Sequence, residues 1–155
     1  MKFIPTLIVA LLISNVAFAQ EKKPNQKKGS EIKKFINAYV SAFNQEDSEK
    51  VQACFHFPHS TLNQEQEFTV VNDASELELE SFWNLIKTDF NWKSNKVKKI
   101  QVFASTEDTA MVGLTMEGMN GDGKAFTIAK GFLGLSKKGG KWGFSQVSWY
   151  FTPVE

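Results

Sequence analysis

The sequence contains no arginine, so its 18 basic residues are all lysine. It therefore lacks the planar guanidinium fork that grips phosphates and carboxylates through two parallel hydrogen bonds. The lysines are balanced by 17 acidic residues, which leaves a formal net charge of +1. A chain so close to neutral offers no electrostatic footprint for nucleic acid, and strongly anionic ligands are disfavoured.

Cysteine is almost absent, with Cys54 as the single example. One thiol cannot form an internal disulfide, and we expect Cys54, next to Phe55, to act as a small buried hydrophobic residue. The sequence also lacks a Gly-x-Ser-x-Gly elbow, a phosphate loop and a dinucleotide fingerprint. We therefore assign no catalytic residue and no cofactor, and these absences favour a binding protein over an enzyme.

Long hydrophobic runs are confined to residues 3–16, which follow a short positive start at Lys2. The small residues Ala17 and Ala19 end the run in an A-x-A pattern, as at a signal-peptidase site. A membrane span needs about 20 unbroken apolar residues, and this run is shorter. We predict a signal peptide (1–19) cleaved after Ala19, a secreted or periplasmic product, and no membrane span after cleavage.

Beyond the predicted cleavage site the chain has no repeat and no second composition block. Residues 20–30 are polar, rich in lysine and free of large apolar side chains, which predicts a flexible leader. Residues 31–155 are long enough for one hydrophobic core and too short for two. We expect a single domain there.

Helical periodicity dominates the first half of this domain. Apolar residues at i, i+3 and i+4 intervals predict one helix after Ser30 and another after Asp73, each capped by that residue. Asp47 is placed to cap a short helix between them, which runs to Phe55 before Pro58 ends it. The two apolar stripes are Ile32, Phe35, Ile36, Tyr39, Val40 and Phe43, then Leu79, Phe82, Trp83, Ile86 and Phe90.

The second half changes to the alternating period of strands. One short strand precedes the third helix and four long ones follow it, over residues 66–71, 97–104, 110–119, 125–135 and 142–152. Glycine-rich turns between the last strands predict antiparallel hairpins. The element order predicts an α+β fold, with about three N-terminal helices on one face of a curved antiparallel sheet. Such a cone leaves a mouth that can admit a ligand.

The segments FINAYVSAFNQEDSEKVQACFHFP and AFTIAKGFLGLSKKGGKWGFSQVSW resemble the nuclear transport factor 2-like superfamily, which includes ketosteroid isomerase, scytalone dehydratase and polyketide cyclases. The resemblance covers about residues 31–152. It rests on the helix pattern, Asn-x-x-Asp after the first helix and Gly-Lys-Trp opening the last strand. It implies a cone-shaped α+β barrel and, in many members, a homodimer formed through the outer sheet face. It implies no reaction, because members differ widely in function.

The resemblance also places individual residues. Set against the isomerase pattern, Tyr39 occupies the place of the oxyanion-hole tyrosine, and Trp149 faces the cavity from the last strand. Asn63 falls on or near the general base, and Gly131 near the protonated aspartate. An amide cannot abstract a proton and glycine has nothing to donate, so this chain is not expected to run that isomerisation.

The histidines His56 and His59 are the only two in the chain and stand in the sequence His-Phe-Pro-His. No third ligand of suitable type adjoins them, so no metal site is predicted. His59 would supply half of the histidine and carboxylate pair that a dehydratase-like site requires, whereas His56 is expected to be structural.

Three functions remain open. The first is an exported domain that binds a small, largely apolar and neutral molecule in an aromatic-lined cone. The second is an isomerase, dehydratase or hydrolase-type enzyme that uses Tyr39 and His59. The third is a homodimeric protein-interaction module without a ligand, working through an aromatic outer sheet face. For the first, the predicted ligand-binding residues are Tyr39, Phe43, His59, Asn63, Trp83 and Trp149.

Overall fold

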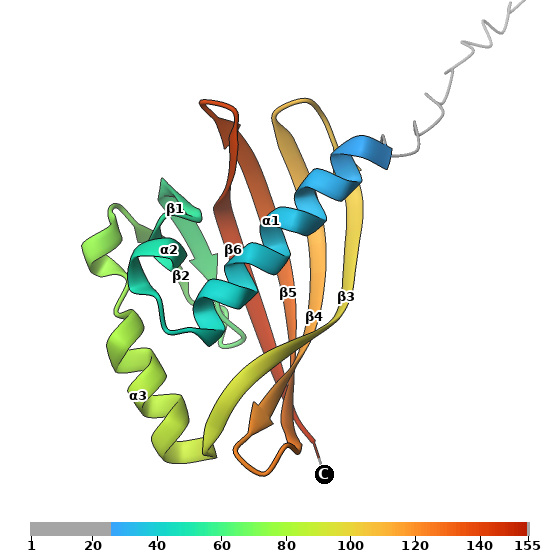
Figure 1. Cartoon of the computed structure of the whole chain (residues 1–155). Helices are drawn as coiled ribbons and strands as arrows, with labels where there is room; N and C mark the ends of the chain where they lie inside the picture. Colours follow the sequence, from blue (N-terminus) through green and yellow to red (C-terminus); the bar gives the residue numbers. More distant parts are fainter. Residues whose placement is uncertain (1–25, 155) are drawn as a thin grey trace, which may run out of the picture.

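The computed structural model describes residues 26–154, and the predicted signal peptide lies outside them. Figure 1 shows the helices gathered on one side of a strongly curved sheet, with α1 crossing in front of the long strands. Within the described residues no helix has the length and apolar character to cross a membrane. The elements are α1 (Gln26–Asn44), α2 (Ser48–Gln52), β1 (Phe55–Leu62), β2 (Phe68–Val71), the 3-10 helix η1 (Ala74–Glu76), α3 (Leu79–Phe90), β3 (Trp92–Ser105), β4 (Thr109–Asn120), β5 (Ala125–Lys138) and β6 (Lys141–Pro153).

The predicted α+β cone is confirmed, with one correction to the sheet. Its strand order is β2-β1-β6-β5-β4-β3, and β3 to β6 form the expected antiparallel meander. The sheet is nevertheless mixed, because β1 runs parallel to β6. The antiparallel pairings were predicted from hairpin turns. No such turn joins β1 to β6, so the turn residues could not predict the relative direction of these two strands.

The structure corrects the interpretation of residues 53–62. The short helix α2 begins after Asp47, whose carboxylate accepts a hydrogen bond from the Lys50 backbone N–H, but it stops at Gln52. The next residues form strand β1, and Pro58 lies within it. The pairing of β1 with β6 is irregular between Phe55 and Ser60, so the missing N–H of proline is tolerated there.

Two helix starts also differ from the prediction. Helix α1 begins at Gln26 rather than after Ser30, so residues 26–30 of the predicted leader are helical. Lysine and glutamine are good helix formers and extend a helix that the following apolar stripe has already nucleated. Asp73 caps η1 by accepting from the Ser75 backbone N–H at 2.8 Å, and α3 starts only at Leu79.

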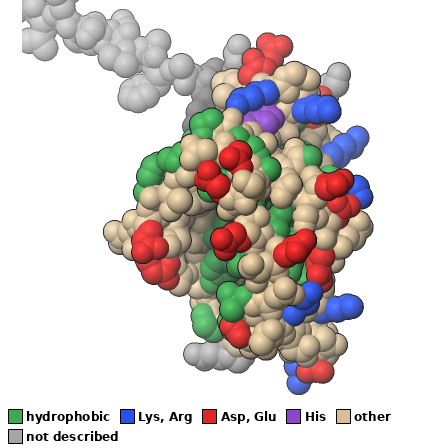
Figure 2. Space-filling model, turned by 90° about the vertical axis from the view of Figure 1, so that its left-hand side faces the viewer, with side chains coloured by type: hydrophobic (Ala, Val, Ile, Leu, Met, Phe, Trp, Pro, Cys, Tyr) green, Lys and Arg blue, Asp and Glu red, His purple; other side chains and the backbone are tan. Residues whose placement is uncertain are grey.

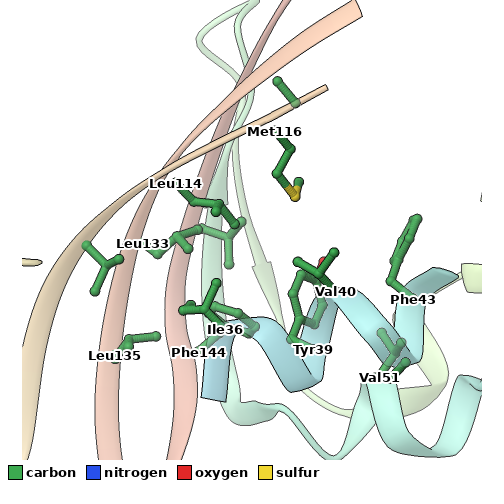
Figure 3. Close-up of a cluster of buried hydrophobic side chains, with 14 of the residues drawn as sticks. Ile36, Tyr39, Val40, Phe43, Val51, Leu114, Met116, Leu133, Leu135 and Phe144 are labelled. Atoms are coloured by element: carbon green, nitrogen blue, oxygen red, sulfur yellow. The ribbon is translucent and has the colours of Figure 1, made fainter. Parts of the chain in front are cut away.

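The core fills the space between α1 and the concave face of the sheet. Figure 3 shows Ile36 and Tyr39 of α1 lying near Leu114 and Leu133 of the central strands and Phe144 of β6. The alternation of buried and exposed residues along β4 and β5 follows the pleat of the sheet. Because α1 is held by this core, its C-terminal half forms a fixed wall for the space beside it.

Candidate ligand-binding cavity

A cavity of about 500 Å³ opens between the C-terminal half of α1, helix α3 and the concave face of the sheet. Its volume lies within the range of small-molecule sites, which is roughly 300 to 1,000 Å³. None of the residues that line it is charged. Aromatic side chains reach it from both helices and from three of the strands, among them Tyr39, Phe43, Phe90, Trp92, Phe126 and Trp149.

Helix α3 forms one side of the mouth, and Trp83 is its one fully buried residue. Trp83 is only 2% exposed and packs edge-on against Phe43, with ring centroids 5.4 Å apart. Phe82, Leu85 and Phe90 all remain substantially exposed although they are apolar. They line the cavity instead of the core, which leaves the apolar stripe of α3 without a full partner. Figure 2 shows hydrophobic side chains exposed on the side of the molecule that α3 occupies.

Stacked aromatic pairs shape the ends of the cavity. Phe90 of α3 stacks on Phe126 of β5, with centroids 5.2 Å apart and planes 8° from parallel. On β6, Trp149 stacks on Phe151 at 6.4 Å. The indole of Trp149 also lies directly over Gly131, where a Cβ atom would stand 2.7 Å from the ring. Glycine at this position therefore lets Trp149 lie flat on the concave face.

Tyr39 brings a hydroxyl into these aromatic walls. Its ring is buried and packs edge-on against Phe144, with centroids 4.8 Å apart. Within residues 26–154 no hydrogen bond to this hydroxyl is found, and the hydroxyl is not among the fully enclosed polar atoms that lack a partner. Burial, and to a smaller extent the neighbouring Cys54, raises the pKa of Tyr39 well above its ordinary value. The group therefore stays protonated and keeps its hydrogen for donation.

Two amide side chains also belong to the polar part of the lining. Asn95 Oδ1 accepts a hydrogen bond from Trp92 Nε1 at 3.1 Å, and the Asn95 backbone is held by the side chain of Asn44 at 2.8 and 3.0 Å. Gln64 Oε1 accepts from the Phe151 backbone N–H at 3.1 Å, which ties the β1–β2 turn to the end of β6. In both amides the oxygen is engaged by the protein.

Half of the predicted site residues come together at this cavity. Tyr39, Phe43 and Trp149 line it. Trp83 lies behind Phe43 rather than in the wall, and Asn63 is occupied within the β1–β2 turn. The Asn63 side chain accepts from the Glu67 backbone N–H and donates to the Glu67 carboxylate, both at 2.9 Å.

His59 is buried elsewhere, among aromatic rings. Phe55 packs against it at 4.8 Å and also contacts Tyr39 at 6.2 Å. Nδ1 of His59 has no hydrogen-bond partner in the described part of the chain, and desolvation lowers the pKa of the imidazole. His59 does not line the cavity with Tyr39, and the two do not form an acid–base pair there.

The second histidine lies at a different place. His56 Nδ1 lies 2.9 Å from the Ser136 hydroxyl, and its ring covers Gly143. Among residues 26–154, no three histidine, cysteine, aspartate or glutamate side chains gather as metal ligands would.

Sequence reasoning missed Gln64 and Asn95. Gln64 directly follows Asn63, so the error was one residue within a polar turn that carries no periodicity. Asn95 stands in a lysine-rich strand start, and its position depends on Asn44, 51 residues away along the chain. No local pattern in the sequence predicts the contact between Asn95 and Asn44.

Comparison with known proteins identifies the fold. No protein-family model matches the sequence, and no curated protein matches it significantly. Among solved structures, a protein of unknown function with a cystatin-like fold from Nostoc punctiforme is similar, with a TM-score of 0.67, 14% identity and coverage of 86% of this chain and 97% of that one. An NTF2-like protein of unknown function from Shewanella baltica gives a TM-score of 0.60 at 13% identity, covering 86% and 100%.

A third similar structure is a putative scytalone dehydratase from Novosphingobium aromaticivorans, with a TM-score of 0.60, 14% identity and coverage of 83% and 86%. The chain therefore has the nuclear transport factor 2-like fold, as its sequence resemblance implied. At these identities the likeness concerns the fold, which hosts several activities, and the cavity itself must carry any functional argument.

Proposed function

We propose that this chain is an exported protein that binds a small, largely apolar and uncharged molecule in the cone cavity. The observation that carries the proposal is a cavity of about 500 Å³ with aromatic walls and no charged lining residue. An ionised ligand would lose its hydration in such a space without gaining a partner of opposite charge. Export rests on the signal-like segment that ends at Ala19.

Binding without turnover fits the chemistry of the walls. An isomerase, dehydratase or hydrolase needs a group that accepts a proton at the reacting atom. The cavity offers the Tyr39 hydroxyl, with a strongly raised pKa, and two amides, while His59 lies outside the lining. These groups orient a bound molecule and do not supply a base.

A second role, homodimer formation, rests on the outer face of the sheet. Cross-strand pairing places Phe68, Leu62, Ser148, Phe132 and Gly113 in one transverse row. Phe103 covers Gly113 and stacks on Phe132 at 6.3 Å. Phe68, Phe132 and Phe103 are exposed, and exposed apolar residues gathered on one face are typical of a protein interface.

Native mass spectrometry tests the binding proposal. The mature protein is purified from exporting cells, and its native mass is compared with its denatured mass. A small molecule that is released on denaturation supports the proposal and gives the ligand mass. A ligand-free protein that also fails to bind a panel of neutral aromatic compounds would overturn it. The same spectra report a dimer, which Phe132→Lys should convert to monomer if the outer face is the interface.

A further inference from the structure

The cavity lining carries several hydrogen-bond donors that no group in the described part of the chain uses, whereas its amide oxygens already accept hydrogen bonds from the protein. Resting on the proposed function, we propose that the natural ligand is an acceptor-bearing molecule, an aromatic or alicyclic compound carrying carbonyl-type oxygens, and that Asn95 and Gln64 select it.

The first step is the set of free donors. The Tyr39 hydroxyl, the Asn95 Nδ2 amide, the Gln64 Nε2 amide and the Trp149 indole N–H all belong to lining residues. None of these donors has a hydrogen-bond partner within residues 26–154. They come from four different elements: α1, β3, the β1–β2 turn and β6. The lining residues that carry free donors therefore stand on several sides of the cavity.

The second step is that each of the two amide oxygens already accepts one hydrogen bond from the protein. Asn95 Oδ1 takes the Trp92 indole N–H and Gln64 Oε1 takes the Phe151 backbone N–H, each at 3.1 Å. These two bonds also fix which end of each amide is oxygen, so the NH₂ groups are the ends left free. The hydroxyl of Thr127, a further lining residue, gives its hydrogen to the Thr152 carbonyl at 3.2 Å.

The third step follows from the cost of unpaired polar groups. A donor that a bound molecule covers without accepting its hydrogen loses its contact with water, which costs free energy. A ligand that accepts from several donors is therefore preferred over a hydrocarbon of the same shape. A ligand whose polar groups are all donors would leave these N–H groups unpaired and would compete for amide oxygens that already accept one hydrogen bond each. Because no lining residue is charged, a neutral carbonyl fits this surface better than a carboxylate.

The test compares two compounds of nearly identical shape, methyl naphthyl ketone and isopropenylnaphthalene, by calorimetric titration of the mature protein. One net hydrogen bond corresponds to roughly a threefold to tenfold difference in Kd. We expect the ketone to bind at least about threefold more tightly. Asn95→Asp and Gln64→Glu keep the oxygen that Trp92 or Phe151 uses and replace the free NH₂ with an acceptor. Each should reduce the preference for the ketone.

Asn84→Asp is the matched control, because Asn84 is exposed on α3 and does not line the cavity. It adds the same charge outside the lining and should retain the preference. Equal binding of both compounds to the unaltered protein would overturn the inference and leave the proposed function standing. Equal loss of preference in all three variants would also overturn it. Binding of neither compound would overturn the proposed function, and the inference with it.

Discussion

The two faces of the same sheet carry similar residues and do different things. Phe144 on the concave face is 1% exposed, whereas Phe132 on the convex face is 55% exposed. Both faces hold aromatic clusters, but curvature closes the concave one around α1 and leaves the convex one open. Aromatic residues therefore occur on both faces of the sheet, and the curvature of the sheet determines which of them enclose a cavity. The predictions below test this difference, from the largest expected effect to the smallest.

The stability of the fold should depend on the concave face. Phe144→Ala removes a ring that packs against Phe35, Tyr39 and Phe55, and should lower the free energy of unfolding by about 3 to 5 kcal/mol. Phe132→Ala on the convex face should cost less than about 1 kcal/mol in the monomer. Urea unfolding measures both. Comparable losses would show that the convex face is as well packed as the core.

Two glycines offer a matched pair on opposite faces. An added Cβ at Gly131 would stand 2.7 Å from the Trp149 ring, and at Gly113 2.9 Å from the Phe103 ring. Gly131→Ala should push Trp149 into the cavity, cost about 1 to 3 kcal/mol of stability and weaken ligand binding. Gly113→Ala should cost less, because the exposed Phe103 ring can swing into solvent. Thermal unfolding and ligand titration measure the effects of the two substitutions. Weaker ligand binding in Gly113→Ala alone would contradict the assignment of the ligand to the concave face.

The chain contains two tyrosines: Tyr39 of α1 lies on the concave side of the sheet, and Tyr150 of β6 lies on the convex face. Tyr39→Phe removes only the hydroxyl that lines the cavity, and should weaken binding of methyl naphthyl ketone by roughly threefold to tenfold. Tyr150→Phe removes a hydroxyl on the convex face, where the ring packs against Phe132, and should leave Kd unchanged. Calorimetric titration measures both values. An equal effect of the two substitutions would place the ligand elsewhere.

The smallest effect concerns pH. Desolvation lowers the pKa of His59 in the folded state, so the unfolded state binds its proton first. Stability should fall as pH drops below about 6.5, the ordinary histidine pKa, and level off below the folded pKa. His59→Gln should flatten this dependence more than His56→Gln, because His56 is less buried and contacts the Ser136 hydroxyl. Urea unfolding between neutral pH and pH values near 5 measures this dependence. An unchanged dependence of stability on pH in His59→Gln would contradict the prediction.

Periodicity and turn chemistry predicted the part of the fold that depends on neighbours in sequence. The apolar stripe of α1, the Asp47 cap and the β3–β6 meander follow from local rules. The sequence analysis missed strand β1 because a proline such as Pro58 usually indicates a break. The proline is tolerated in this strand because of the irregular pairing with β6, about 85 residues away. Local rules say nothing about such a partner.

The lining residues of the cavity also separate into those that local sequence patterns predicted and those that they did not. Tyr39 and Phe43 lie on a helical stripe whose direction the sequence defines, and both line the cavity. Asn95 and Gln64 became lining residues through contacts with Asn44 and Phe151, which are distant in sequence. Polar residues in turns and strand starts carry no periodicity, so only the assembled fold reveals them.

The central claim is that the concave face, and not the convex one, holds the ligand. Two methionines report on the faces separately: Met116 lines the cavity at 5% exposure, and Met111 stands on the convex face at 63% exposure. Isotope-labelled methionine methyl groups can be followed by NMR while methyl naphthyl ketone is added to the mature protein. The account predicts that the Met116 methyl resonance shifts and saturates while that of Met111 stays in place. A shift of Met111 alone, or of neither, would contradict it.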